Sequence, residues 1–271
     1  MKILMKNTII LSLITLLTFS LVSTLDFNDA KKLADSDKFN VINVQGKIIF
    51  KTSGEEMKRG DIYVSGTRLD FLSSTSRAAI VNKYKGRFVL TGSSKGKLKV
   101  LPATNNMSSR SGALLNALDL KKHFSDRYLV LKRSEIQIGS AAFPMNNENF
   151  FYLTYNHEGE EIAKKLRHEG DFLILDKNEI FKIDGQAIPS SEKEMTLYYK
   201  QEDKGTKIST FIPVFADVEV LKEEVEIMLS SFEDKTNEEK IQEITSYLVE
   251  FYGTPYKSNL NAWLKAEFGL E

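Results

Sequence analysis

The chain has no cysteine among its 271 residues, and it has only 5 prolines, 3 histidines and 1 tryptophan. The lack of cysteine excludes disulfide bonds, thiolate metal sites, a cysteine nucleophile and the lipid-bearing cysteine of bacterial lipoproteins. The stability of the fold must therefore come from packing. Because apolar residues make up 42% of the chain and charged residues 27%, close to the averages for folded proteins, we expect most of it to fold, in two domains.

The N-terminus has the layout of an export signal. Lys2 and Lys6 precede an uncharged apolar run at 9–25. Such a run directs export, and at about 1.5 Å per residue its helix would span about 26 Å, close to the thickness of a bilayer core. A buried core helix is the competing interpretation, which the one-sided lysine flank disfavours. Residues 1–25 are therefore predicted to be a signal peptide or a membrane anchor. Both interpretations are kept because the cleavage motif ending at Thr24 is a poor one.

The formal net charge of zero conceals two oppositely charged segments. Residues 44–110 contain thirteen Lys and Arg against four Asp and Glu, whereas residues 146–271 contain fourteen against twenty-six. A net charge of +9 outside the cytoplasm would attract an anionic envelope surface, an acidic envelope protein, or the acidic half of the same or another copy. Nucleic acid also fits this charge, but export and the lack of a stacking-aromatic motif argue against it.

Residues 39–112 have the pattern of a small β domain. Short apolar or alternating runs are separated by turns rich in Gly, Ser and Asp, which is typical of a sandwich or barrel. The predicted strands are 41–42, 44–50, 62–64, 77–81, 87–91 and 97–101. Residues 101–112 are rich in Ser, Asn and Thr and are predicted to form a long loop.

A helix–strand connection at 113–142 and a second β region at 143–217 follow. The connection is predicted to hold a short helix that ends near His123 and a strand at 128–132. The predicted strands of the second region are 150–155, 172–175, 180–183, 195–199 and 208–215, with turns at 178, 184–185 and 204–205. Residues 160–167 fit both a helix face and a strand of period two.

Residues 218–271 change character, because apolar residues there recur in helical spacing. Two amphipathic helices are predicted, and the pair Thr236 and Glu239 matches a capping box at the start of the second. A shorter third helix carries Trp263. The predicted fold class is therefore mainly β (α+β): a small N-terminal β-sandwich or barrel, a second β-sandwich-like region and C-terminal α-helices that pack as core.

One motif at 92–96 has the G-x-S-x-G pattern of a nucleophile elbow around Ser94. That chemistry needs a strained strand-to-helix turn, whereas the residues that follow alternate like a strand. A β-hairpin loop is therefore favoured, with Ser94 as a turn residue. The same stretch is not a P-loop, because it lacks the spacing and the Ser or Thr that would hold Mg²⁺.

The titratable candidates form no recognisable site. The three histidines, His123, His157 and His168, fit no metal-ligand spacing, and only a surface site formed in the fold by His157 and His168 stays open. The carboxylate pairs 160–161 and 223–224 are adjacent in the chain, whereas glycosidase carboxylates face each other across a cleft. We therefore assign no catalytic, cofactor or metal residues and expect no cofactor.

Four short stretches resemble the periplasmic β domain of the FecR family, the iron-dicitrate sensor regulators. They are Val44–Ile48, Met57–Ile62, Ser76–Ile80 and Gly86–Leu90. Gly46 and Gly60 suit bends of positive φ, and the alanines suit a crowded inward face. The resemblance covers a fifth to a third of the chain and implies a β domain without catalytic residues.

Regulators of that family that act on sigma factors carry a cytoplasmic arm, whereas only about eight residues precede the apolar run here. We therefore expect the extracytoplasmic module without the anti-sigma function. The predicted function is a non-catalytic binding, scaffold or signalling module of the bacterial cell envelope, located in the periplasm or envelope. The alternative is an envelope hydrolase whose site is assembled from residues distant in sequence.

Overall fold

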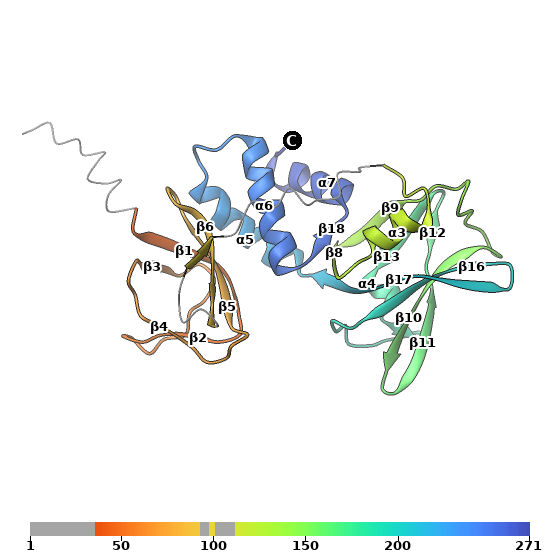
Figure 1. The fold of residues 1–271 in the computed structure, drawn as a ribbon, viewed down its shortest axis with the longest axis horizontal. Coiled ribbons are helices and arrows are strands. Elements are labelled where there is room, and N and C mark those ends of the chain that lie inside the picture. Colours follow the sequence, from red (N-terminus) through yellow and green to blue (C-terminus); the bar gives the residue numbers. More distant parts are fainter. Residues whose placement is uncertain (1–35, 93–97, 101–111) are drawn as a thin grey trace, which may run out of the picture. The chain divides into compact units, whose positions relative to one another are not determined.

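The computed structural model describes residues 36–92, the backbone of 98–100, and residues 112–271. Strands make up 41% of the structure and helices 24%, which confirms the predicted mainly β architecture with C-terminal helices. The chain divides into two compact units, Met1–Val100 and Leu101–Glu271, hereafter the first and second units (Figure 1). The apolar run at 9–25 lies outside the described residues.

The first unit is built from short strands. They are β1 (Lys38–Gln45), β2 (Ile48–Phe50), β3 (Ile62–Val64), β4 (Leu69–Phe71), β5 (Arg77–Asn82), β6 (Gly86–Thr91) and β7 (Leu98–Val100). Five of them form an antiparallel sheet in the order β3-β1-β5-β6-β7, and β2 pairs with β4 in a separate ribbon. The core side chains come from both, including Phe39, Ile48, Tyr63, Ile80 and Leu90.

The predicted strand at 44–50 is interrupted in the structure. Gly46 has φ of +77°, so β1 ends at Gln45 and β2 begins at Ile48. A Cβ at Gly46 would lie 2.6 Å from Ser76 Oγ and 3.0 Å from Ser76 Cα. Glycine is therefore required here both for the positive φ of the bend and for the close contact with Ser76. The prediction was wrong because the apolar pattern continues across the bend.

The second unit contains strands and all five described helices. The helices are α3 (Ala117–His123), α4 (Lys177–Ile180), α5 (Val218–Ser231), α6 (Asn237–Phe251) and α7 (Lys257–Phe268). The strands are β8 (Arg127–Leu131), β9 (Arg133–Gln137), β10 (Phe150–His157), β11 (Glu160–Lys165), β12 (His168–Glu169), β13 (Phe172–Asp176), β14 (Lys182–Ile183), β15 (Gln186–Ala187), β16 (Met195–Gln201), β17 (Lys204–Ala216) and β18 (Thr254–Pro255).

A six-stranded sheet organises the second unit, in the order β11-β10-β16-β17-β8-β18. The β11-β10-β16-β17 portion is antiparallel and consists of two hairpins, β10–β11 and β16–β17, joined by the β10–β16 pair, whereas β17–β8 and β8–β18 are parallel pairs. A three-stranded sheet, β12-β13-β9, completes the fold, and both sheets contribute to one core. That core includes Phe124, Tyr128, Phe151, Leu173 and Phe211.

The structure resolves one ambiguous prediction in the second unit and corrects two others. The ambiguous stretch at 160–167 contains a strand, β11, because Glu160–Lys165 pairs with β10 residue by residue. The predicted strand at 180–183 is instead the end of α4, capped by Asp176, followed by the two-residue β14. The predicted turn at 204–205 forms the start of β17, because the turn falls two residues earlier, at Glu202 and Asp203, with φ of +54° at Glu202.

The C-terminal helices follow their sequence signals. Thr236 and Glu239 form the predicted capping box, in which the Thr236 side chain accepts from Glu239 N and the Glu239 carboxylate accepts from Thr236 N. Gly269 ends α7 in the left-handed conformation, with φ of +66°. Within the ranges that the structure describes, no helix is both long enough and apolar enough to cross a bilayer.

Candidate functional site

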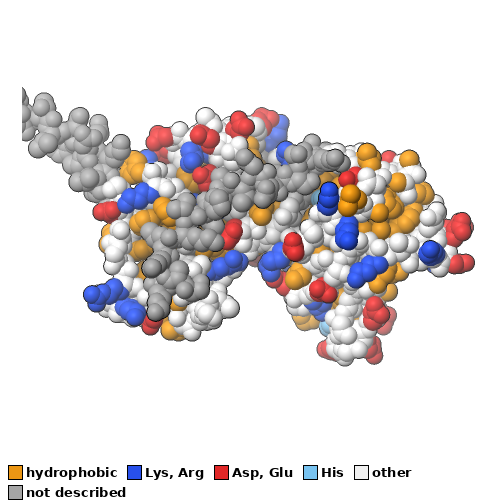
Figure 2. Space-filling view, in the orientation of Figure 1, with side chains coloured by type: hydrophobic (Ala, Val, Ile, Leu, Met, Phe, Trp, Pro, Cys, Tyr) orange, Lys and Arg blue, Asp and Glu red, His pale blue; other side chains and the backbone are white. Residues whose placement is uncertain are grey.

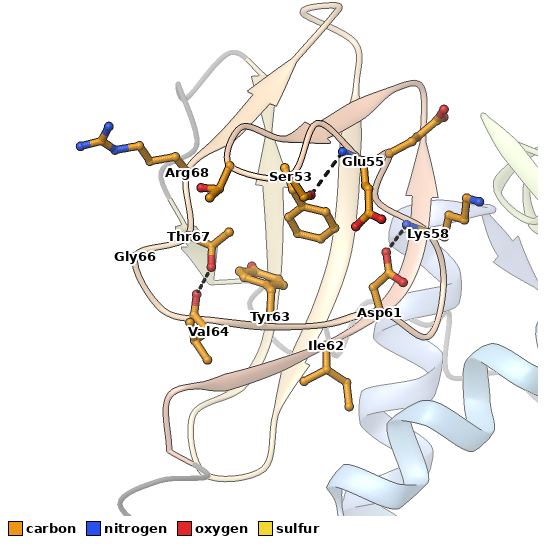
Figure 3. Close-up of a pocket in the computed structure, with 13 residues that line it drawn as sticks. Ser53, Glu55, Lys58, Asp61, Ile62, Tyr63, Val64, Gly66, Thr67 and Arg68 are labelled. Carbon is orange, nitrogen blue, oxygen red and sulfur yellow. Dashed lines mark hydrogen bonds between the residues drawn. The ribbon is translucent and has the colours of Figure 1, made fainter.

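An open depression of about 1190 Å³ lies on the first unit, between the β2–β4 ribbon and the edge strand β3 (Figure 3). Thirteen residues from 50 to 68 line it, so it belongs to one continuous segment of the chain. Figure 3 shows Tyr63 pointing toward the depression from β3, whereas Ile62 points to the opposite side. The depression is the candidate binding site of this unit.

A tight turn positions β3 beside the depression. Asp61 Oδ2 accepts from Lys58 N at 2.7 Å, and Gly60, with φ of +83°, donates its N–H to Val41 O at 2.8 Å. An aspartate that bonds a backbone N–H three residues earlier stabilises such a turn. The turn within Met57–Ile62 thus determines where β3 starts.

Aromatic rings form the inner wall. Tyr63 stacks on Phe39 with ring centroids 5.6 Å apart, and it contacts the Phe50 ring at 6.1 Å. Tyr63 is buried, and burial raises the pKa of its hydroxyl well above the ordinary value. The tyrosine is therefore neutral at physiological pH and serves as an apolar wall with a hydroxyl.

Most polar side chains around the depression hold the loops in place. Ser53 Oγ accepts from Glu55 N at 3.3 Å, and Thr67 Oγ1 donates to Val64 O at 2.7 Å. Glu56 pairs with Lys47, with 3.5 Å between the carboxylate and the ammonium. These groups are engaged in structure.

Three charged side chains at the depression remain available. Lys58, Arg68 and Glu55 are exposed, and none of them forms an ion pair with another described residue. Two cations and one anion can therefore meet a charged ligand without first breaking an internal pair. An unpaired exposed cation attracts a partner at little desolvation cost.

The strand β3 presents both backbone and apolar side chains. Among the strands that the structure describes, it is the edge of the five-stranded sheet and pairs only with β1. Ile62 and Val64, on the face opposite Tyr63, are 64% and 53% exposed. An edge strand with two exposed branched side chains is a template for addition of an extended segment from another chain.

The elbow-like motif at 92–96 is flanked by a hairpin. Strands β6 and β7 pair antiparallel, with Phe88 opposite Val100 and Leu90 opposite Leu98. This pairing confirms the hairpin interpretation, because an elbow requires a helix where β7 lies. Residues 93–97, including Ser94, lie outside the described residues.

The histidines take separate places in the second unit. His168 Nδ1 lies 3.2 Å from Gly170 O, and His157 ends β10. In the described ranges no group of three or more histidine and acidic side chains is arranged to hold a metal ion. His123 is packed edge-to-face against Phe124, Tyr128 and Tyr256 at 4.9–5.3 Å.

The half-buried position of His123 among aromatic rings is a feature that sequence analysis missed. Its Nε2 lies 3.0 Å from the Tyr128 hydroxyl, and burial lowers its pKa to about 4. The imidazole is therefore neutral at neutral pH. The only sequence clue was its place between the apolar face of α3 and a strand.

The adjacent carboxylates also separate in the fold. Glu160 and Glu161 lie exposed on β11, where alternation sends neighbouring side chains to opposite faces. Glu224 is buried on α5, and its carboxylate accepts hydrogen bonds from the hydroxyls of Tyr247 at 2.7 Å and Tyr252 at 2.8 Å. Neither pair faces the other across a cleft. Glu224 links α5 to α6 and its end, a role that its sequence neighbours do not reveal.

Comparison of the chain with protein-family models, with curated proteins and with solved structures finds no match.

Proposed function

We propose that this chain is a non-catalytic binding module of the bacterial cell envelope, exported or anchored through residues 1–25. Its first unit holds a partner protein at the depression and the adjoining edge strand. The partner is acidic or carries an acidic segment, since the segment 44–110 has a net charge of +9. The resemblance to the FecR periplasmic domain supports this proposal.

The proposal rests on three features that occur together at β3. An open sheet edge, two exposed apolar side chains and two unpaired cations, Lys58 and Arg68, adjoin one another along a single segment. Strand addition supplies affinity through backbone hydrogen bonds, and flanking charges select the partner. The engaged roles of Ser53, Asp61 and Thr67 favour binding over catalysis at this place.

The test is site-specific photo-crosslinking in intact cells of the source bacterium. A photoreactive residue replaces Ile62 in one variant and Leu72, which is 59% exposed, in a matched control. We expect a discrete cross-linked adduct from position 62 and none from 72. We further expect Lys58→Glu with Arg68→Glu to abolish the adduct, while Lys121→Glu with Lys122→Glu on α3 leaves it intact.

Export is tested separately. A fusion of residues 1–40 to a reporter that is active only outside the cytoplasm should be active. A stable but inactive fusion would refute the location. Equal adducts from positions 62 and 72, or an adduct unaffected by the charge reversals at 58 and 68, would refute the binding mode.

A further inference from the structure

The outer face of the large sheet in the second unit carries a row of aromatic rings. Along β10, Phe151, Leu153 and Tyr155 point into the core, so alternation turns Phe150 and Tyr152 to the outer face. Both outer rings are half-buried rather than covered. The inner face and the outer face of this sheet are thus chemically different, and the outer one is aromatic.

Cross-strand pairing gathers three rings at one place. Tyr152 lies opposite Tyr198 of β16, and the two rings stack with centroids 5.0 Å apart and 11° between their planes. The Phe150 ring is 6.2 Å from the Tyr152 ring. Gly205 of β17 leaves space for this arrangement, because a Cβ there would lie 2.5 Å from the Tyr152 hydroxyl. The glycine inside a strand is explained by that close approach.

Lysines surround these rings. The Lys165 ammonium is 4.2 Å and the Lys200 ammonium 5.5 Å from the centroid of Phe150, and Lys207 pairs across strands with Tyr198. None of the three forms an ion pair with any residue that the structure describes. We call this set the aromatic–lysine face: Phe150, Tyr152, Lys165, Tyr198, Lys200 and Lys207.

Hydroxyl groups continue the same face along the sheet. Thr154 lies opposite Thr196, and Thr196 Oγ1 is 3.2 Å from Thr210 Oγ1 on β17. The threonines and the two tyrosines give a row of donors and acceptors beside the lysines. Aromatic rings, hydroxyls and ammonium groups on one surface match a ligand that has apolar ring faces, many hydroxyls and negative charge.

Acidic side chains near this face lie at its margins. Glu161 is opposite Asn156, near the end of the β10–β11 hairpin, and Glu202 and Asp203 form the β16–β17 turn. Figure 2 shows acidic side chains at the tips of both hairpins. The proximity of Tyr198 and Glu161 adds to burial in raising the pKa of Tyr152, so this phenol stays neutral. The cations therefore occupy the middle of the face.

We propose that the aromatic–lysine face binds an acidic polysaccharide. Sugar rings pack on Phe150 and the tyrosine pair, the lysines pair with the glycan carboxylates, and the threonine row bonds the sugar hydroxyls. One observation favours glycan over single-stranded nucleic acid. Threonine and tyrosine hydroxyls line the face beside the lysines, and such groups match the hydroxyls of sugars. The choice also rests on the extracytoplasmic location proposed above, where nucleic acid is scarce.

The test measures binding of a short oligogalacturonate to the purified full-length chain by calorimetry at low ionic strength. Neutral dextran and oligothymidylate are the comparison ligands. We expect oligogalacturonate to bind, dextran not to bind, and Lys165→Gln with Lys200→Gln to weaken the affinity at least about tenfold. Tyr198→Ser should weaken it to a similar degree. Lys165→Arg with Lys200→Arg should retain binding.

The matched control is Lys177→Gln with Lys182→Gln, which removes the same charge. These lysines flank Ile180, whose carbonyl accepts from the inward-pointing Tyr155, so they lie over the opposite side of the sheet. The control should bind like the parent chain, and unchanged circular dichroism should show that every variant is folded.

Three results would overturn the proposal: no binding of oligogalacturonate, equal weakening by the control pair, or tighter binding of oligothymidylate with the same dependence on Lys165 and Lys200. Because the assay uses purified protein, it can fail while export and the Ile62 cross-link succeed. It can also succeed while they fail.

Discussion

The two units have opposite net charges, but each contains both paired and unpaired cations among the described residues. Residues 36–92 contain ten Lys and Arg against five Asp and Glu, yet Lys47, Lys51 and Lys85 are paired with carboxylates. Residues 112–271 contain nineteen against twenty-nine, yet three lysines of the aromatic–lysine face have no carboxylate partner among the described residues. Net charge along a segment therefore does not locate the cations that are free to bind. The unit with the negative net charge thus carries a group of lysines without carboxylate partners among the described residues.

Bends of positive φ are packed to different degrees within the protein. In the first unit, Gly54 and Gly60 have positive φ with nothing within 4 Å of an added Cβ. In the second, Gly253 has φ of +113°, and a Cβ there would lie 2.3 Å from Arg127 O. That glycine follows Tyr252, the residue after α6, and directly precedes β18, which pairs with β8. Two backbone segments therefore approach closely at Gly253, whereas Gly54 and Gly60 lie in open turns.

The largest expected effect comes from breaking that close approach. Gly253→Ala should lower the free energy of unfolding by about 4 kcal/mol, because it adds both positive-φ strain and a clash with backbone. Gly54→Ala carries only the strain and should cost about 1 kcal/mol. Urea unfolding of the full chain measures both. Equal losses would show that the close backbone approach at Gly253 adds nothing to the positive-φ strain.

A smaller effect should appear on acidification. No histidine precedes His123 in the chain, so a histidine-linked loss of stability belongs to the second unit. Burial lowers the pKa of His123 to about 4 in the folded state, so a falling pH favours the unfolded chain, which takes up the proton first. Stability should fall between about pH 6.5 and about pH 4, by about 3 kcal/mol in total.

Unfolding measured across this pH window checks the prediction. His123→Phe should flatten the profile, whereas His157→Phe should leave the loss in place. A profile unchanged by His123→Phe would assign the acid sensitivity to carboxylates instead.

The smallest expected difference concerns two side-chain hydrogen bonds of threonine, one in each unit. Thr236→Ala removes one half of the capping box of α6 and should cost about 1 kcal/mol. Thr67→Ala in the first unit removes an exposed bond to Val64 O and should cost about 0.5 kcal/mol. The shift in urea midpoint at constant slope distinguishes the two. A larger loss at Thr67 would mean that this loop contributes more to the first unit than its exposure implies.

Local patterns predicted much of the fold because their physical causes are local. The capping box at Thr236, the apolar stripes of α5 and α6 and the alternation in β10 and β16 depend only on neighbouring residues. Strand β9 was missed because Ile136 is its only apolar residue, and the three-residue strand β4 was also missed. The helical turn α4 was misassigned, since its apolar end resembles the start of a strand.

The candidate sites show the same division. The segment Met57–Ile62 was singled out from its turn chemistry, yet the sequence gives no sign that Lys58 stays unpaired while Lys47 meets Glu56. The predicted absence of a stacking-aromatic motif rested on contiguous patterns. The three rings of the aromatic–lysine face come from two strands more than forty residues apart at Phe150 and Tyr198, and only strand register brings them together.

The sequence by itself determined the elements: mostly short strands, three C-terminal helices and the turns between them, because dihedral preference, capping and periodicity act within a few residues. The tertiary structure alone decided the parallel β17–β8 pairing, the packing of His123 among aromatic rings, the burial of Glu224, and which of the described lysines stay unpaired. These depend on contacts between residues far apart in the chain. Register and burial are set by packing the whole core, which no local pattern encodes.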